Sequence, residues 1–296
     1  LPIYHIYSLS VLVLAGYTNG GLNVLITNPR DTDGFVKEIR KWRFTFFNGV
    51  NTLYESLLNH PEIKNVNFDS MKLSGTGGSA CRQSTAERWQ ELTGNVLLEG
   101  YGLSETSPSV SVSPSYLTKF NGFVGLPVPS TEISIRDETG KQVRRGAPGE
   151  ICVKGPQVMQ GYWNNEEATK EAIDEEGFFK TGDIGTLNSD GFIKIVDRKK
   201  DMILVSGFNV YPNEIEDVVS LHPEIIEAAC IGVDDDKTGE AVKLFVVKNN
   251  PSLSADEVMD YCRDNFTGYK VPKHIEFIDE LPKSNVGKVL RRSLRE

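Results

Sequence analysis

The sequence predicts an α/β domain of two subdomains, followed by a smaller α+β domain. Three changes of pattern along the 296 residues support this prediction. Short apolar strands alternate with amphipathic helices over residues 22–110, glycine and proline punctuate short apolar segments over residues 120–197, and helices mix with strands again over residues 199–296. Strand–helix alternation is typical of a largely parallel sheet covered by helices. Closely spaced turns between short strands are typical of a small β-barrel or sandwich.

In the first segment we expect strands at residues 22–27 and 96–98, and helices at residues 34–41, 52–59 and 81–92. In the last of these helices Ala86, Trp89 and Leu92 share one face, and Gly94 ends the helix. The apolar stretch at residues 9–15 is too short to span a bilayer, so we interpret it as a buried element of a fold that begins upstream of Leu1.

In the later segments we expect strands at residues 133–136, 150–154, 191–196, 226–233, 241–247 and 274–278. Pro212 is suited to the first turn of a helix, and Ser254 with Glu257 forms a capping box before another. These patterns place the part boundaries at residues 1–118, 119–198 and 199–296, where the first two parts belong to one domain.

Charge and cysteine usage exclude several classes of function. The chain carries 41 acidic and 32 basic residues, and a net charge of −9 argues against binding to nucleic acid, which needs a basic face. The basic tail at residues 270–296 either serves an anionic ligand or is simply solvated. The four cysteines and four histidines are scattered without metal-ligand spacing. We therefore expect a reducing, cytoplasmic location and no disulfide framework.

Three polar segments could carry chemistry. The first, SGTGGS at residues 74–79, could present backbone N–H groups to an anion, or form a plain turn. The second, YGLSE at residues 101–105, follows a predicted strand, where ligands of open α/β sheets bind. Its aromatic ring, hydroxyl and carboxylate could serve a base, a phosphate and Mg²⁺, or form a capped turn.

The third segment combines Asp183 with Arg198 in the run DRKKD at residues 197–201. A carboxylate accepts two hydrogen bonds at once, which suits the two hydroxyls of a ribose. An arginine supplies permanent positive charge for phosphate or ribose oxygens. A surface cluster of ion pairs is the alternative interpretation.

Taken in order, these segments resemble the adenylate-forming superfamily, which includes acyl-CoA synthetases, firefly luciferase and the adenylation domains of peptide synthetases. The resemblance covers essentially the whole chain, and its motifs are LPIYH at residues 1–5, EGYGLSE at 99–105, KTGD at 180–183, GFIKIVDR at 191–198, VSGFNVYPNEIE at 205–216 and LPKSNVGK at 281–288. Within the superfamily, residues 197–216 and 281–292 are most similar to bacterial long-chain fatty-acid–CoA ligases.

For the nucleotide, the resemblance implies that Gly77, Gly78, Tyr101 and Gly102 bind ATP around its adenine. Ser104, where the family usually has threonine, is implied to contact the α-phosphate. Two further nucleotide contacts are implied at the ribose, Asp183 and Arg198. The resemblance also implies two groups of opposite charge at the reacting phosphate, namely Glu105 as the Mg²⁺ ligand and Lys288 as the catalytic lysine of adenylation.

For the later steps, the resemblance implies that Lys200 is the hinge between the large domain and a mobile C-terminal domain, and that Gly207 lies at the mouth of the pantetheine tunnel for coenzyme A. The family's loop for the β- and γ-phosphates lies upstream of LPIYH. We therefore expect a fragment that lacks this loop and is inactive alone.

The implied activity is ATP-dependent activation of a fatty acid to an acyl-adenylate, and transfer of the acyl group to coenzyme A. Fatty acids partition into lipid, so contact with the inner face of the cytoplasmic membrane stays open, as does a homodimer. Two alternatives stay open as well. One is an adenylating enzyme with another acceptor, like a luciferase or a peptide synthetase. The other is a nucleotide-binding module without catalysis, although Glu105, Asp183 and Lys288 together argue against it.

Overall fold

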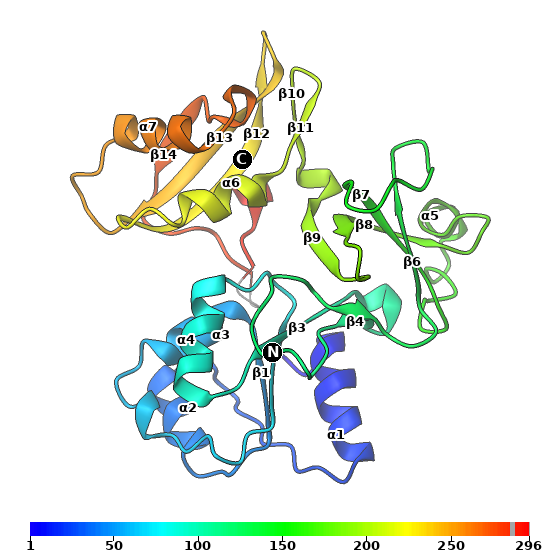
Figure 1. Cartoon of the computed structure of the whole chain (residues 1–296), viewed down its shortest axis with the longest axis vertical. Helices are drawn as coiled ribbons and strands as arrows, with labels where there is room; N and C mark the ends of the chain where they lie inside the picture. The colour runs from blue at the N-terminus through cyan, green and yellow to red at the C-terminus, as the bar shows by residue number, and fades with distance from the viewer. Residues whose placement is uncertain (285–287, 296) are drawn as a thin grey trace. The chain divides into compact units, whose positions relative to one another are not determined.

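The computed structural model describes residues 1–284 and 288–295 (Figure 1). The chain forms two compact units. The large unit comprises residues 1–181 and 186–195, and the small unit comprises residues 182–185 and the described residues from 196 to 295. Strand β8 (Phe179–Leu187) therefore contributes residues to both units.

A five-stranded sheet lies at the centre of the large unit (Figure 1). Its strands follow the order β1 (Phe46–Gly49), β2 (Leu73–Gly77), β3 (Leu97–Gly102), β4 (Ser109–Val112) and β5 (Leu126–Pro127). The first three strands run parallel, as predicted, and the last two are antiparallel additions. Strand β3 continues beyond the predicted residues 96–98 because its glycines pair with the flanking strands. The carboxyl ends of β1, β2 and β3 therefore meet at one edge of the sheet.

Helices α2 (Thr32–Ile39), α3 (Asn51–Leu58) and α4 (Gln83–Thr93) contribute to the core of this unit. The ring of Trp89 is fully buried, and its centroid lies 4.7 Å from that of Tyr54 and 5.5 Å from that of Phe47. The Tyr54 hydroxyl donates a hydrogen bond of 2.6 Å to the carbonyl of Gly75 in β2. The aromatic core therefore fixes helices α3 and α4 against the parallel strands.

The glycine-rich segment forms a second sheet, with the order β6 (Glu132–Arg136), β7 (Gly149–Lys154), β8 and β9 (Ile193–Arg198). Helix α5 (Glu166–Ala172) lies between β7 and β8 in sequence. Within the described residues this sheet stays open instead of closing into a barrel, because four strands are too few to curl into a cylinder. The predicted mixture of α/β and α+β architecture is otherwise confirmed.

The small unit is built on a sheet with the order β11 (Phe208–Val210), β10 (Ile203–Val205), β13 (Gly239–Lys248) and β12 (Ile225–Asp235), and β14 (His274–Phe277) pairs in parallel with β13. Helices α6 (Pro212–Val219) and α7 (Ala255–Asn265) supply apolar side chains to the larger of its two clusters, and α7 starts at the predicted capping box. Successive residues of a strand face opposite sides. Along β12, Ala228 and Cys230 join that cluster, whereas Ala229 and Ile231 pack against Leu281 on the other side.

The remaining helical segments are short. They are a π-helix at Ser8–Leu14, α1 at Ala15–Thr18, and 3-10 turns at Ile63–Asn65, Ser104–Thr106, Lys199–Asp201, Gly268–Lys270 and Arg291–Leu294. Among the helices of the described residues, none combines the length and apolar character that a membrane-spanning helix requires.

Two expectations for the start of the chain are wrong. Residues 22–27 form no strand, and Leu22 and Leu25 are exposed. A strand needs a partner, and in the described sheet β1 pairs only with β2. The apolar stretch at residues 9–15 is helical but not a buried element, because Ser8 is the one buried residue of the two helices that contain it.

Strand β3 also carries a buried carboxyl group. The Glu99 residue is 6% exposed, and its Oε1 accepts a hydrogen bond of 3.3 Å from the backbone N–H of Cys81, just before α4. Burial raises the pKa of Glu99 to about 7, and the Cys81 hydrogen bond opposes the shift. Glu99 therefore connects β3 to the loop that follows Gly77 and Gly78.

We expect Trp89→Ala to destabilise the large unit by about 3–5 kcal/mol, because it leaves a cavity among buried rings. Urea unfolding followed by tryptophan fluorescence measures this change, since Trp42 and Trp163 remain in the same unit. The matched control is Trp163→Ala, because Trp163 is 91% exposed and should contribute little. Equal losses for the two variants would contradict the core assignment.

We expect the stability of the large unit to fall as pH rises from 4.5 to about 7, because folded Glu99 binds a proton in this range that the unfolded chain has lost. At about 1.4 kcal/mol per pKa unit, this contribution is on the order of 3 kcal/mol. Glu99→Gln keeps an acceptor for the Cys81 N–H and removes the titration. Urea unfolding over this pH range should therefore show a flatter profile for the variant, and parallel profiles would refute the prediction.

Candidate functional site

The two glycine-containing segments of the large unit lie at the carboxyl ends of adjacent parallel strands. Gly77 ends β2 and pairs in register with Gly100 of β3, and Gly78 follows with a φ of +82°. A Cβ atom on Gly77 would lie 3.0 Å from both the Gly100 carbonyl and the Tyr7 ring, and one on Gly102 would lie 1.8 Å from the Pro108 carbonyl. Close backbone packing requires glycine at Gly102 and leaves little room for a side chain at Gly77, and the structure brings the two predicted nucleotide segments together.

Glu105 lies immediately beyond this edge, in the 3-10 turn that also contains Ser104. Its carboxylate accepts a hydrogen bond of 3.0 Å from the Tyr162 hydroxyl, and its backbone carbonyl accepts one of 2.8 Å from Met159. These contacts hold both ends of the residue from the same loop, after β7. The Glu105 carboxylate is half-buried, and the Tyr162 hydroxyl contacts one of its two oxygens, Oε1.

Three other predicted residues lie near one another in the small unit. Asp183 is buried on β8, and its Oδ1 lies 3.7 Å from Nε of Arg198. Burial lowers the pKa of the Lys288 ammonium, the positive charge of Arg198 lowers it further, and the negative charge of Asp183 opposes both effects. A carboxylate, a guanidinium and a half-buried ammonium from distant parts of the sequence therefore share one electrostatic environment.

The predicted hinge residue Lys200 is exposed within the 3-10 turn Lys199–Asp201. The acidic residues on either side of it are buried. Asp197 accepts hydrogen bonds of 2.7 Å from the backbone N–H groups of Arg198 and Asn213, and Asp201 lies 3.2 Å from Nη2 of Arg295. The lysine thus sits on a short turn whose two ends are fixed within the small unit.

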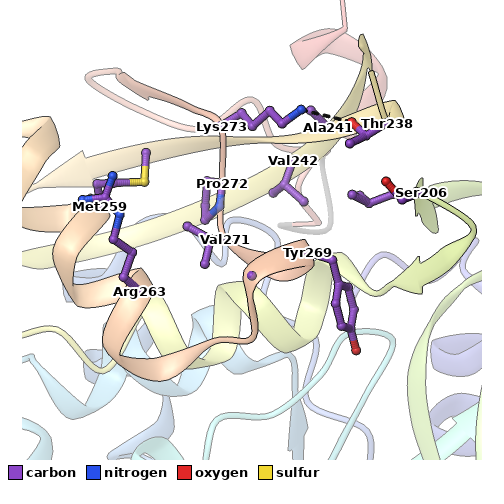
Figure 2. Close-up of a pocket in the computed structure, with 12 residues that line it drawn as sticks. Ser206, Thr238, Ala241, Val242, Met259, Arg263, Tyr269, Val271, Pro272 and Lys273 are labelled. Carbon is purple, nitrogen blue, oxygen red and sulfur yellow. Dashed lines mark hydrogen bonds between the residues drawn. The ribbon is translucent and has the colours of Figure 1, made fainter. Parts of the chain in front are cut away.

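Gly207 forms the tight turn between β10 and β11, with a φ of +82° beside Ser206 at +51°. A pocket of about 430 Å³ opens next to this turn. Figure 2 shows Ser206 and Thr238 at one end of the pocket and Arg263 at the other. Tyr269 lines it as well, and its ring is stacked on that of Phe208, with centroids 4.8 Å apart.

The pocket includes residues that the sequence reasoning did not single out, chiefly Tyr269 and Lys273. The Lys273 ammonium lies 2.8 Å from Asp235, and this contact, with a hydrogen bond of 2.7 Å donated by the Thr238 hydroxyl, keeps the pKa of Asp235 well below its usual range. The available signal was an aromatic residue, Tyr269, immediately before the basic tail. Its role in a pocket is visible only in the structure, where the residues that precede β14 lie beside the Gly207 turn.

The sequence profile of the AMP-binding enzyme family matches residues 1–163, and the profile of the C-terminal domain of AMP-binding enzymes matches residues 214–288. The chain is 56% identical to the long-chain-fatty-acid–CoA ligase of Escherichia coli O6:H1 over 296 residues, which is 100% of the chain and 53% of that protein. It is 40% identical over 300 residues to the enzyme of the same name from Bacillus subtilis, again covering 53% of that protein. The chain thus spans about half the length of these relatives.

Solved structures agree with the sequence matches. The ATP-bound structure of MatB from Rhodopseudomonas palustris superimposes with a TM-score of 0.92 at 34% identity, covering 100% of this chain and 58% of that one. The o-succinylbenzoate CoA synthetase of Bacillus subtilis in complex with an acyl-adenylate intermediate has a TM-score of 0.86 at 31% identity, covering 100% of this chain and 60% of that one. Both family profiles occur here in order, and the first covers more than half of the residues. The chain therefore belongs to the family of AMP-binding enzymes.

Proposed function

We propose that the protein activates a long-chain fatty acid with ATP and transfers the acyl group to coenzyme A. The names of the relatives from Escherichia coli and Bacillus subtilis support the substrate, and the acyl-adenylate complex of the synthetase neighbour supports the intermediate. The observation that carries the proposal is the environment shared by Asp183, Arg198 and Lys288. A module that only binds a nucleotide needs the first two, whereas the lysine suits a reaction in which phosphate charge develops.

In the first step, a carboxylate oxygen of the fatty acid attacks the α-phosphorus of ATP, and pyrophosphate leaves with the bonding electrons. Gly77, Gly78 and Tyr101 would receive the adenine, and Asp183 the ribose. The Lys288 ammonium would stabilise negative charge that accumulates on the α-phosphate, which is where a preorganised donor contributes most.

Glu105 and Ser104 would complete the contacts around this phosphate. No group of three or more acidic, histidine or cysteine side chains suited to a metal ion occurs among the described residues. Mg²⁺ nevertheless fits Glu105, because this ion is usually bound by one or two carboxylates together with substrate phosphates. When bound, Mg²⁺ would neutralise phosphate charge, and the Tyr162 hydroxyl would keep the carboxylate oriented.

In the second step, the thiol of coenzyme A loses its proton and attacks the acyl carbonyl, and AMP leaves. The Gly207 turn would pass the pantetheine chain. The adjacent pocket suits the nucleotide end of coenzyme A, because it combines an aromatic ring at Tyr269 with basic side chains at Arg263 and Lys273. Flat rings stack on a base, and cations pair with phosphates.

The proposal also includes a cytoplasmic location, contact with the inner face of the cytoplasmic membrane through the lipid-soluble substrate, and a homodimer. A vesicle flotation assay and sedimentation velocity would test the last two directly.

We expect Lys288→Ala to slow adenylate formation by about 10²-fold or more, the usual effect of removing one transition-state donor. The assay uses the chain joined to the part of the Escherichia coli O6:H1 relative that lies outside the match, called the completed enzyme below. Pyrophosphate release from palmitate and ATP measures the first step. Supplied with palmitoyl-AMP and coenzyme A, the variant should form thioester at nearly the normal rate.

The matched control is Lys283→Ala. Lys283 belongs to the same basic segment, but its ammonium pairs with Glu227 at 2.6 Å. This variant should keep both half-reactions. A parallel loss of both half-reactions in Lys288→Ala, or of neither, would contradict the role of the lysine. Inactivity of the completed enzyme itself, with correct folding, would favour the nucleotide-binding module.

We expect Tyr269→Ala to raise the KM for coenzyme A by about tenfold, because stacking of one base on an aromatic ring contributes about 1–3 kcal/mol. Adenylate formation should not change. Steady-state kinetics of the completed enzyme with varied coenzyme A provide the measurement. Tyr116→Ala is the control, because this ring is exposed in the large unit. An unchanged KM would place the nucleotide end of coenzyme A elsewhere.

A further inference from the structure

Arg291 connects the last turn of the small unit to helix α6. Its side chain is 13% exposed, and Nε and Nη2 donate three hydrogen bonds of 2.8–3.2 Å to the two carboxylate oxygens of Glu216. Nη2 also donates a bond of 2.7 Å to Oδ1 of Asn213. Glu216 in turn accepts the backbone N–H of Cys230 in β12 at 2.8 Å. The guanidinium is therefore fixed to a helix and, through that helix, to the central sheet.

The remaining nitrogen of the same guanidinium faces the hinge segment. Nη1 lies 3.5 Å from Oδ2 of Asp201 and 4.0 Å from Oδ1 of Asp197. These two buried carboxylates lie on either side of Lys200 in sequence. Burial raises the pKa of Asp197, and the positive charge of Arg291 opposes this shift. One buried cation therefore serves both ends of the turn on which the predicted hinge residue lies.

Arg291 is also only three residues beyond Lys288, and the backbone around Lys288 is fixed by hydrogen bonds. The backbone N–H of Ser284 donates to the Lys288 carbonyl at 2.8 Å, and the N–H of Leu290 donates to the Pro282 carbonyl at 2.8 Å. Val289 packs against the apolar cluster on the second face of the sheet. The lysine backbone is thus held by these backbone hydrogen bonds on one side and by the side chain of Arg291 on the other.

We propose that Arg291 is a positioning residue that ties Asp201, which directly follows the predicted hinge residue Lys200, to the segment that carries Lys288, so that both move as one block. This inference rests on the proposed function, because it assigns the consequence of that motion to adenylate formation. A planar guanidinium with five donors can serve Glu216, Asp201 and Asp197 at once, whereas a lysine ammonium cannot match the paired carboxylate oxygens. A change of backbone angles at Lys200 would therefore displace Lys288 together with Asp201.

Asp201→Asn tests the proposal most directly, because it weakens the contact of Asp201 with Arg291, together with its contact with Arg295, and leaves the contact between Glu216 and Arg291 in place. In the completed enzyme, adenylate formation should fall by about tenfold, the factor that corresponds to 1.4 kcal/mol. Thioester formation from supplied palmitoyl-AMP should change by less than about twofold. Asp201→Glu keeps the negative charge and should recover most of the lost rate. A purely structural role would slow both half-reactions together.

A second readout does not depend on activity. In the 296-residue chain, hydrogen exchange of the backbone amides in residues 288–295 should become about tenfold faster in Asp201→Asn, because the segment loses one of its anchors. The matched control is Glu276→Gln, which makes the same change of carboxylate to amide in the pair between Glu276 and Lys243, 2.8 Å apart in the same unit. It should change neither exchange in this segment nor either half-reaction.

The outcomes separate the two proposals. An inactive completed enzyme with faster exchange in Asp201→Asn would refute the proposed function and keep the link between the two segments. An active enzyme in which Asp201→Asn affects both half-reactions equally, or neither, would overturn the positioning role. Should Asp201→Asn not fold, Arg291→Lys makes the same test, since it keeps the charge and loses the planar fork. Normal adenylate formation in Arg291→Lys would then refute the inference.

Discussion

One buried guanidinium lies among three largely buried carboxylates of the small unit. Glu216, Asp197 and Asp201 are all largely withdrawn from water, and Arg291 is the cation that lies near all three. Leaving buried carboxylates without a counter-ion costs several kcal/mol, roughly 3–5 when one partner of a buried pair is removed. The arrangement therefore constrains the end of the chain. The turn with Arg291 has to return to helix α6 and to residues 197–201, and this return determines where Lys288 is placed.

The large unit obeys a different constraint, which is the close approach of backbone segments at the carboxyl ends of β2 and β3. Gly102 has no room for a Cβ atom because the Pro108 carbonyl occupies that space, and at Gly77 the Gly100 carbonyl and the Tyr7 ring leave little room for one. The aromatic core around Trp89 packs against this sheet and fixes α3 and α4, the helices that precede and follow β2. A rigid scaffold with a smooth glycine edge is well suited to receive a flat base, and Glu105 stands directly beside it, oriented by Tyr162. Close packing of the backbone and the proposed binding of a flat base thus both favour glycine at the ends of β2 and β3.

Much of this could be predicted from the sequence. The 3.6-residue periodicity around Trp89, the stop at Gly94 and the capping box at Ser254 each act within one turn of chain, and the structure confirms them. The strand expected at residues 22–27 failed because local apolar character cannot supply a neighbouring strand. The expected barrel failed for a related reason, since closure depends on how many strands meet. The Tyr269 pocket was missed because it is assembled from β10, β13 and the loop before β14, which are far apart in sequence.

By itself, the sequence determined the order of the motifs, the residue types at each proposed site and the local helices and strands. These properties depend on covalent neighbours and on hydrogen bonds that span a few residues. Only the tertiary structure decided which of these residues share an environment. Asp183 and Lys288 lie more than a hundred residues apart, and their charges and that of Arg198 act on one another because the small unit folds them together. The partners of Arg291 were likewise invisible in the sequence, where it is one basic residue among several in a tail. Electrostatic interactions depend on distance and burial, and both of these arise only when the chain is folded.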